Sequence, residues 1–164
     1  MSTQETEPTA AQEFAVPVSD RMRDLDFLLG EFRVEYTNLV ADPPATGTAS
    51  WTTRSVYNGH VYELLQSVPE HGIEGRWIFG WSASSSSFYG LYHDNWGNHS
   101  TPSSKGWDED GAIRFVGDCF GFGQQFVTKE EFEVIDEDHF VKRSFAQQGD
   151  AWVPSDVIHA YRVK

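Results

Sequence analysis

The residue types that most often carry chemistry gather around one short turn, residues 92–97, with the sequence Tyr-His-Asp-Asn-Trp-Gly. An aspartate enclosed among aromatic side chains can act as a general base or hold a hydroxyl or amine of a ligand. His93 lies beside Asp94, and His159 lies near Tyr161 on a later segment; a histidine ring can take up and release protons. Asp94, His93 and His159 are therefore the candidate catalytic residues. An aspartate before Asn-Trp-Gly also suits an Asx turn, and this structural interpretation is the stronger one.

Metal, haem and nucleophilic centres have less support in the sequence. The histidines at 60, 93, 99 and 159 are scattered, and none form a His-x-His or His-x₃-His pair. Strands of a barrel can still bring distant ligands together, and a single histidine could hold haem, but we expect no metal site and no cofactor. Cys119 is the only cysteine, so neither an intrachain disulfide nor a Cys-based zinc site can form. The serine run 84–87 lacks the Gly-x-Ser-x-Gly spacing of a nucleophile elbow.

Composition sets limits on the class of protein. The 164 residues are 39% hydrophobic and 15% aromatic, enough for one globular domain with many rings in its interior. A formal net charge of −13 argues against binding to nucleic acid or to an anionic membrane surface. The start of the chain is polar and acidic, unlike a signal peptide. We expect a cytoplasmic protein with a flexible tail over residues 1–17 and a single domain over residues 18–164, and leave open whether it forms a homodimer.

The elements that must position these side chains are nearly all strands. Residues 19–29 predict a short helix, with Ser19 as N-cap, Gly30 as C-cap, and Met22, Leu25, Leu28 and Leu29 on one face. After it, alternating segments follow one another, separated by Gly-, Asn-, Asp- and Ser-rich turns. The sequence predicts strands over residues 31–39, 48–57, 60–68, 76–82, 88–94, 99–107, 112–120, 125–135, 140–147 and 152–163.

This order of elements predicts an all-β fold. No segment is long enough to be a crossover helix, so a parallel sheet is excluded, and a sandwich or an up-and-down barrel remains. The uniform meander favours an antiparallel barrel of about ten strands, which leaves no exposed edge, with the helix closing one end. In residues 99–107 the strand is weak because it contains Pro102.

Strand alternation then sorts side chains into inner and outer sets, if the more apolar face of each strand points inward. The predicted ligand-binding residues on these inner faces are Tyr36, Tyr62, Trp77, Phe79, Trp81, Tyr92, Phe115, Phe132 and Tyr161. Polar residues also fall on these faces, namely His60, Gln66, Tyr92, Asp94, Thr128, Glu130, Ser144 and His159. Such groups either hydrogen-bond within the core, the more frequent case, or contact a ligand.

Three stretches resemble a large bacterial family of unknown function with a lipocalin-like, calycin-type barrel. They are residues 25–32 (Leu-Asp-Phe-Leu-Leu-Gly-Glu-Phe), residues 58–65, which begin Asn-Gly-His, and residues 92–97. Phe32 stands where the family usually has Trp, and the serines after Trp81 are atypical. The resemblance implies a barrel with a central cavity. It implies no particular substrate, since the family has no common assigned reaction.

The sequence therefore favours a barrel that binds a small, largely apolar, aromatic or polycyclic molecule in an internal cavity. The alternative is an enzyme on the same scaffold, such as a cyclase, isomerase or dehydratase acting on a polyketide- or terpenoid-like intermediate of secondary metabolism. In that case Asp94 with a histidine or tyrosine would be the acid/base pair. The sequence does not separate the two.

Overall fold

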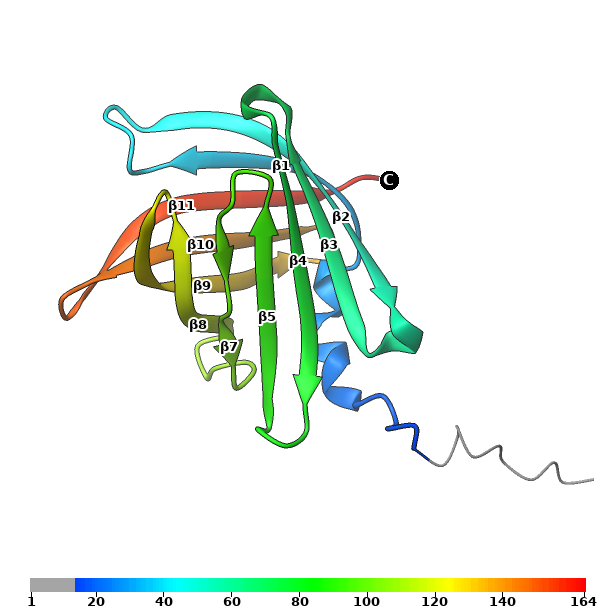
Figure 1. Ribbon diagram of the computed structural model, residues 1–164. Helices are drawn as coiled ribbons and strands as arrows, with labels where there is room; N and C mark the ends of the chain where they lie inside the picture. Colours follow the sequence, from blue (N-terminus) through cyan, green and yellow to red (C-terminus); the bar gives the residue numbers. More distant parts are fainter. Residues whose placement is uncertain (1–13) are drawn as a thin grey trace, which may run out of the picture.

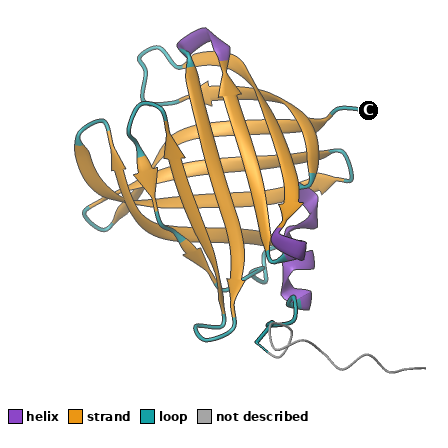
Figure 2. Cartoon of the chain, turned by 45° about the vertical axis from the view of Figure 1, so that its right-hand side comes forward, coloured by secondary structure: helices purple, strands orange, loops and turns teal. Residues whose placement is uncertain are grey.

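The computed structural model describes residues 14–164 and shows a closed antiparallel β-barrel with a short helix at one end (Figure 1, Figure 2). The predicted fold class is confirmed. The expected tail falls mainly on residues 1–13, which lie outside the described part of the chain. No helix within residues 14–164 is long and apolar enough to cross a membrane.

Apart from β6 and β7, which do not pair with each other, each strand pairs antiparallel with the next one along the chain, and pairing of β1 with β11 closes the barrel. The strands are β1 (Gly30–Asn38), β2 (Ala45–Val56), β3 (Val61–Val68), β4 (Ile73–Ser82), β5 (Ser87–Asp94), β6 (His99–Ser100), β7 (Ser103–Ser104), β8 (Ala112–Gly121), β9 (Gln124–Asp136), β10 (His139–Gln148) and β11 (Ala151–Arg162). Because β6 and β7 both pair with β5 and β8, they occupy one position, and the barrel has ten strand positions.

The interruption between β6 and β7 comes from Pro102, as the sequence predicts. Its ring packs against Gly90 of β5, and a Cβ atom at Gly117 of β8 would lie 2.6 Å from both the Thr101 oxygen and the Pro102 Cα. Only glycine leaves room for a backbone that approaches this closely. The segment therefore presses onto the two glycines and is buried at Pro102.

The helix, η1 (Asp20–Leu28), is a 3₁₀ helix capped by the Ser19 side chain, which accepts a hydrogen bond from the Arg21 backbone N–H. Met22, Leu25 and Leu28 are buried, and their spacing of three suits the three residues per turn of a 3₁₀ helix. The predicted cap Ser19 is confirmed. Gly30 is not the C-cap, because Leu29 takes that place and Gly30 begins β1 with φ +116°.

The two ends of the barrel differ. At the helix end, η1 lies near η2 (Tyr57–Gly59) and the connections at 83–86, 105–111 and 137–138. At the opposite end, which we call the open end, lie η3 (Pro69–His71) and the turns at 39–44, 95–98, 122–123 and 149–150. Figure 2 shows that no helix comparable with η1 covers the open end.

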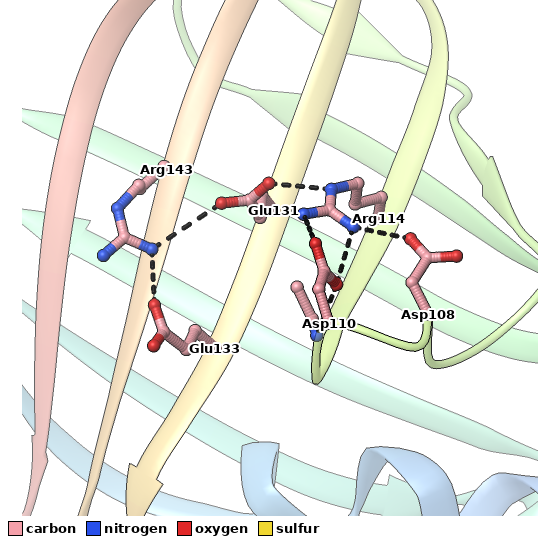
Figure 3. Close-up of polar contacts among 7 residues, drawn as sticks. Asp108, Asp110, Arg114, Glu131, Glu133 and Arg143 are labelled. Carbon is pink, nitrogen blue, oxygen red and sulfur yellow. Dashed lines mark hydrogen bonds and ion pairs between the residues drawn. The ribbon is translucent and has the colours of Figure 1, made fainter.

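The outer face of β8, β9 and β10 carries a network of ion pairs (Figure 3). Arg114 contacts Asp108, Asp110 and Glu131 at 2.6–2.7 Å, and Arg143 contacts Glu131 and Glu133. The Arg114 guanidinium lowers the pKa of the exposed Asp110 carboxyl. This network is partly exposed, so its contribution to stability is small.

Candidate functional site

The interior of the barrel has two halves that differ in packing. In the half next to η1, inward side chains are apolar and buried, and their rings meet at centroid separations of 5–6 Å. The largest fully buried side chains of the core are Trp51, Phe79, Phe88, Phe115, Phe132 and Phe140. This half is a filled hydrophobic core, which we call the helix half.

In the half next to the open end, seven inward side chains keep part of their surface accessible. They belong to Tyr36, Gln66, Tyr92, Cys119, Phe126, Asp156 and Ile158. We call this the open half. Since these residues point into the barrel, their accessible surface shows that solvent reaches the interior from this end.

A row of polar side chains crosses three strands on the boundary of the two halves. Cross-strand pairing aligns Glu130 of β9, Ser144 of β10 and Asp156 of β11, and Lys142 occupies the next inward position of β10. The Lys142 Nζ lies 2.6 Å from Glu130 Oε2 and 3.8 Å from Asp156 Oδ1. Both Lys142 and Glu130 are buried, with 8% and 9% of their side chains exposed. We call these four residues the lysine cluster.

Hydrogen bonds join the members of the lysine cluster. Lys142 Nζ donates to Ser144 Oγ at 2.6 Å, and Ser144 Oγ lies 2.6 Å from Glu130 Oε2 and 2.9 Å from Asp156 Oδ1. Thr128 donates to the second oxygen of Glu130 at 2.9 Å. Buried charges in proteins are paired and hydrogen-bonded in this way, because an isolated buried charge is costly.

Burial and neighbouring charge act on the ionisable groups of the cluster in different directions. Burial raises the pKa of Asp156, with Glu130 adding to the effect and Lys142 and Ser144 opposing it. For Lys142, burial disfavours the ammonium form, but the carboxylates of Glu130 and Asp156 outweigh it and raise its pKa. Lys142 is therefore a stable cation, whereas the raised pKa means that the Asp156 carboxyl loses its proton at a higher pH than an ordinary aspartate does.

The facing wall of the barrel carries a hydrogen-bonded chain. Trp51 Nε1 donates to Gln66 Oε1 at 3.2 Å, Gln66 contacts the Tyr92 hydroxyl, and that hydroxyl donates to Asp94 Oδ2 at 3.0 Å. Burial, together with Asp94, raises the pKa of Tyr92, so it stays a neutral donor. Cys119 also faces this half, and burial with the nearby Glu130 and Asp94 carboxylates raises its pKa to about 11.

Asp94 has a full set of partners within and beside its own turn. Its Oδ1 accepts from the backbone N–H groups of Trp96 and Asn98, and its Oδ2 accepts from the Tyr92 hydroxyl and the Asn98 side chain. All four distances are between 2.9 and 3.0 Å. This agrees with the Asx-turn interpretation, and it leaves Asp94 little capacity to accept a proton from a ligand.

We expect the substitution Asp94→Asn to act on stability. An amide keeps one oxygen for the turn but presents an NH₂ group to two donors, so we expect a loss of about 1–3 kcal/mol. Urea denaturation measures the loss, and Asp118→Asn, an exposed position on the outer face of β8, serves as the control. If the variant instead keeps its stability but binds the fluorescent probe N-phenyl-1-naphthylamine more weakly, Asp94 contacts the ligand.

The structure does not bring the three candidate catalytic residues together. His93 is exposed on the outer face of β5, with Arg76 its cross-strand partner. His159 also lies on the outer face, where its Nδ1 is 3.1 Å from His139 Nε2. Tyr161 stacks on His139 at 4.4 Å, so the expectation that His159 and Tyr161 line the interior is wrong. The inward residues of β11 are Asp156, Ile158 and Ala160.

Most of the other predicted ligand-binding residues lie in the helix half. Trp77, Phe79, Phe115 and Phe132 are buried in its core. Tyr62 donates to Asp26 of η1 at 2.6 Å, and burial with this bond raises its pKa to about 12.

Three predicted residues lie nearer the ends of the barrel. Trp81 packs on Phe88 beneath the Arg21 guanidinium, at the helix end. Tyr36 and Tyr92 belong to the open half. The Tyr36 ring covers Gly47, and its hydroxyl has no hydrogen-bond partner among residues 14–164.

Two members of the lysine cluster escape detection in the sequence. Lys142 lies between hydrophobic and basic neighbours, and lysine is seldom buried, so alternation alone gave no reason to place it inside. Asp156 follows a register shift in the β10–β11 pairing, between Ser144 and Phe145, that changes which residues of β11 face inward. Glu130, Ser144 and Thr128 were expected on inner faces, and there they lie.

Within residues 14–164 no three His, Cys, Asp or Glu side chains are grouped so as to hold a metal ion. Two shallow hollows lie at the surface. One of about 310 Å³ is bordered by Glu74, Arg76 and His93, and one of about 390 Å³ is bordered by Trp96, Phe120 and Phe122. Neither contains the lysine cluster.

Comparisons with known proteins support the fold. No family model and no curated protein matches the sequence. Among solved structures, the crystal structure of Rv2717c from M. tuberculosis aligns with a TM-score of 0.61 at 9% identity, covering 90% of this chain and 100% of that one. A DUF3598-family protein of unknown function from Nostoc punctiforme PCC 73102 aligns with a TM-score of 0.46 at 14% identity, covering 85% of this chain and 48% of that one. At this identity the first likeness shows a shared barrel fold.

Proposed function

We propose that this protein binds a small molecule with an apolar, aromatic body in the open half of the barrel. The observation that carries the proposal is the division of the interior. Inward side chains of the helix half are packed against one another, whereas several of those in the open half remain accessible around a hydrogen-bonded polar lining. Binding sites typically combine an apolar wall with a few fixed polar groups.

The two halves have different roles in this proposal. The aromatic core forms the floor of the site and holds its shape. Tyr92 and Phe126 supply ring surfaces to the ligand, and the Gln66 amide and the lysine cluster supply polar contacts. The helix half also contains four of the predicted ligand-binding residues. In this proposal they pack beneath the ligand, on the side of the helix half, without contacting it; they are Trp77, Phe79, Phe115 and Phe132.

The proposal also covers the type, origin and location of the protein. We propose a calycin-type, lipocalin-like barrel of bacterial origin that is located in the cytoplasm. Its partner is a small molecule rather than nucleic acid or membrane. The charge of −13 supports the exclusion of nucleic acid.

A catalytic role for the same site has one observation in its favour. Asp156 is an inward carboxyl whose pKa is raised by burial, and carboxyl groups with raised pKa values occur often among catalytic acids and bases. An acid/base step on a bound polyketide- or terpenoid-like intermediate would then depend on Asp156 rather than Asp94. In that case Asp156→Asn abolishes turnover while the barrel still binds its ligand.

Cys119 provides a direct test of ligand binding, because it is the single thiol and faces the open half. The probe is N-phenyl-1-naphthylamine, a neutral aromatic molecule that fluoresces in apolar surroundings. We expect it to bind with energy transfer from tryptophan, and to slow alkylation of Cys119 by N-ethylmaleimide at least fivefold.

The control moves the thiol to the outer face of the same strand, in the variant Asp118→Cys/Cys119→Ser. Its alkylation should be faster, since the raised pKa of Cys119 keeps little of the thiol ionised, and it should not respond to the probe. Absence of probe binding, or equal alkylation of Cys119 with and without saturating probe, would refute the proposed function.

A further inference from the structure

The lysine cluster contains more negative charge than positive charge. Glu130 and Asp156 face one ammonium group, and the distances of 2.6 and 3.8 Å assign Lys142 to Glu130. Of the twelve Lys and Arg residues, all within the described chain, Lys142 is the only buried one. No second cation of the protein is therefore placed inside the barrel to neutralise Asp156.

Asp156 is also short of hydrogen-bond donors. The Ser144 hydroxyl has one hydrogen, yet Glu130 Oε2 and Asp156 Oδ1 both lie within hydrogen-bond distance of its oxygen. Lys142 donates to that same oxygen, which directs the hydroxyl hydrogen to one of the two carboxylates. When the Ser144 hydroxyl donates its hydrogen bond to Glu130, Asp156 has no donor within the cluster closer than 3.8 Å.

Asp156, the carboxyl without its own cation, is also the most accessible ionisable residue of the lysine cluster. The Asp156 side chain is 34% exposed, against 8% for Lys142 and 9% for Glu130. Asp156 belongs to the inward set of the open half, so a ligand there could reach it. An anionic ligand would meet this carboxyl and a lysine already paired with Glu130.

We propose that the ligand carries a protonated amine on its aromatic body, and that this ammonium group binds the Asp156 carboxylate. The inference rests on the proposed function and adds the chemical class of the ligand. An ammonium would neutralise the excess charge of the cluster and supply the missing donor. Tyr92 in the same interior can also attract a cation through its ring face.

Three matched probes test the proposal at pH 7: 1-naphthylmethylamine, 1-naphthalenemethanol and 1-naphthoic acid. They share the ring system and differ in head-group charge. Calorimetry should show the amine binding at least tenfold more tightly than the alcohol, and the acid binding most weakly. Asp156→Asn should weaken amine binding at least tenfold and change alcohol binding less than twofold, whereas the outer-face control Asp118→Asn should change neither.

Stability supplies a second readout of Asp156. A carboxyl whose folded pKa is raised favours folding while protonated, and this advantage is lost as the pH rises from the ordinary value of about 3.9 through the raised one. Asp156→Asn should therefore melt at the same temperature as the wild type at pH 4 and at a higher temperature at pH 7. The groups that face Asp156 and act on its pKa are Lys142 and Ser144 of β10 and Glu130 of β9.

The outcomes separate the two proposals. If none of the three probes binds, the proposed function fails. If the alcohol or the acid binds the wild type as tightly as the amine, the proposed function stands and the amine inference is wrong. The difference in melting temperature between Asp156→Asn and the wild type is the second criterion. If the variant melts below the wild type at pH 7, and by a wider margin than at pH 4, Asp156 is a structural residue and the inference is wrong.

Discussion

Replacement of Lys142 by methionine should destabilise the protein by about 3–5 kcal/mol at pH 7, the usual effect of removing one partner of a buried ion pair. Met fills a similar volume, so the loss reports the charge. Glu130 would remain 91% buried with only hydroxyl donors, and Asp156 would lose its nearest cation. Because the pKa of Lys142 is raised, the wild-type pair persists to alkaline pH, and its contribution is lost only above about pH 10.4.

Chemical denaturation of Lys142→Met measures this loss, and acidification should reduce it, because protonation of Asp156 removes one of the repelling charges. Arg143→Met is the matched control on the same strand. Arg143 points to the outer face and its side chain is 35% exposed, so its removal should cost less than about 1 kcal/mol. The double variant Lys142→Met/Glu130→Leu should recover most of the stability. A loss for Lys142→Met no larger than that for Arg143→Met would mean that the pair is not buried in solution.

Truncation of Phe132 to alanine should cost a similar amount, about 3–5 kcal/mol, through the cavity that it leaves in the helix half. The Phe132 ring lies among four other aromatic rings, with centroid separations of 5.9–6.4 Å. These rings belong to Phe27, Phe79, Phe115 and Phe140. Phe27 is part of η1, so the substitution also loosens the contact between the helix and the barrel.

The comparison variant is Val134→Ala, two residues further along β9, where the side chain is 40% exposed. It should lose less than about 1 kcal/mol. Binding of N-phenyl-1-naphthylamine in the open half should survive in Phe132→Ala, and benzene should gain a new site in the dry cavity. If Phe132→Ala loses probe binding while it remains folded, the ligand site extends into the helix half.

Alternation and turn chemistry were sufficient to predict the barrel. In β1 the inward Phe32 and Val34 alternate with the polar Arg33 and Glu35, and the turns near Gly59 and Gly149 lie where the sequence predicts them. The weakness caused by Pro102 was also visible in the sequence. The helix was foreseen but not its 3₁₀ form, although the spacing of Met22, Leu25 and Leu28 by three residues is consistent with both kinds of helix.

The inner face of β11 could not be predicted, because its two faces have the reverse of the expected polarity. Tyr161 and His159 look like core residues, yet they lie outside, where Tyr161 stacks on His139 and beneath the Arg33 guanidinium. The inward Ala160 is small because large rings from other strands already fill the helix half. Which face is buried depends on barrel closure and on the register shift near Ser144, and a single strand shows neither.

Both ends of the described chain lie at the helix end of the barrel. Val163 donates its backbone N–H to Glu31, and Arg162 contacts the Leu29 and Phe27 carbonyls, so the last strand finishes beside the start of the first. A surface tether or fused partner attached after residue 164 would therefore leave the open end unobstructed. An array of molecules immobilised through this terminus would present the open end of every barrel to the passing solution.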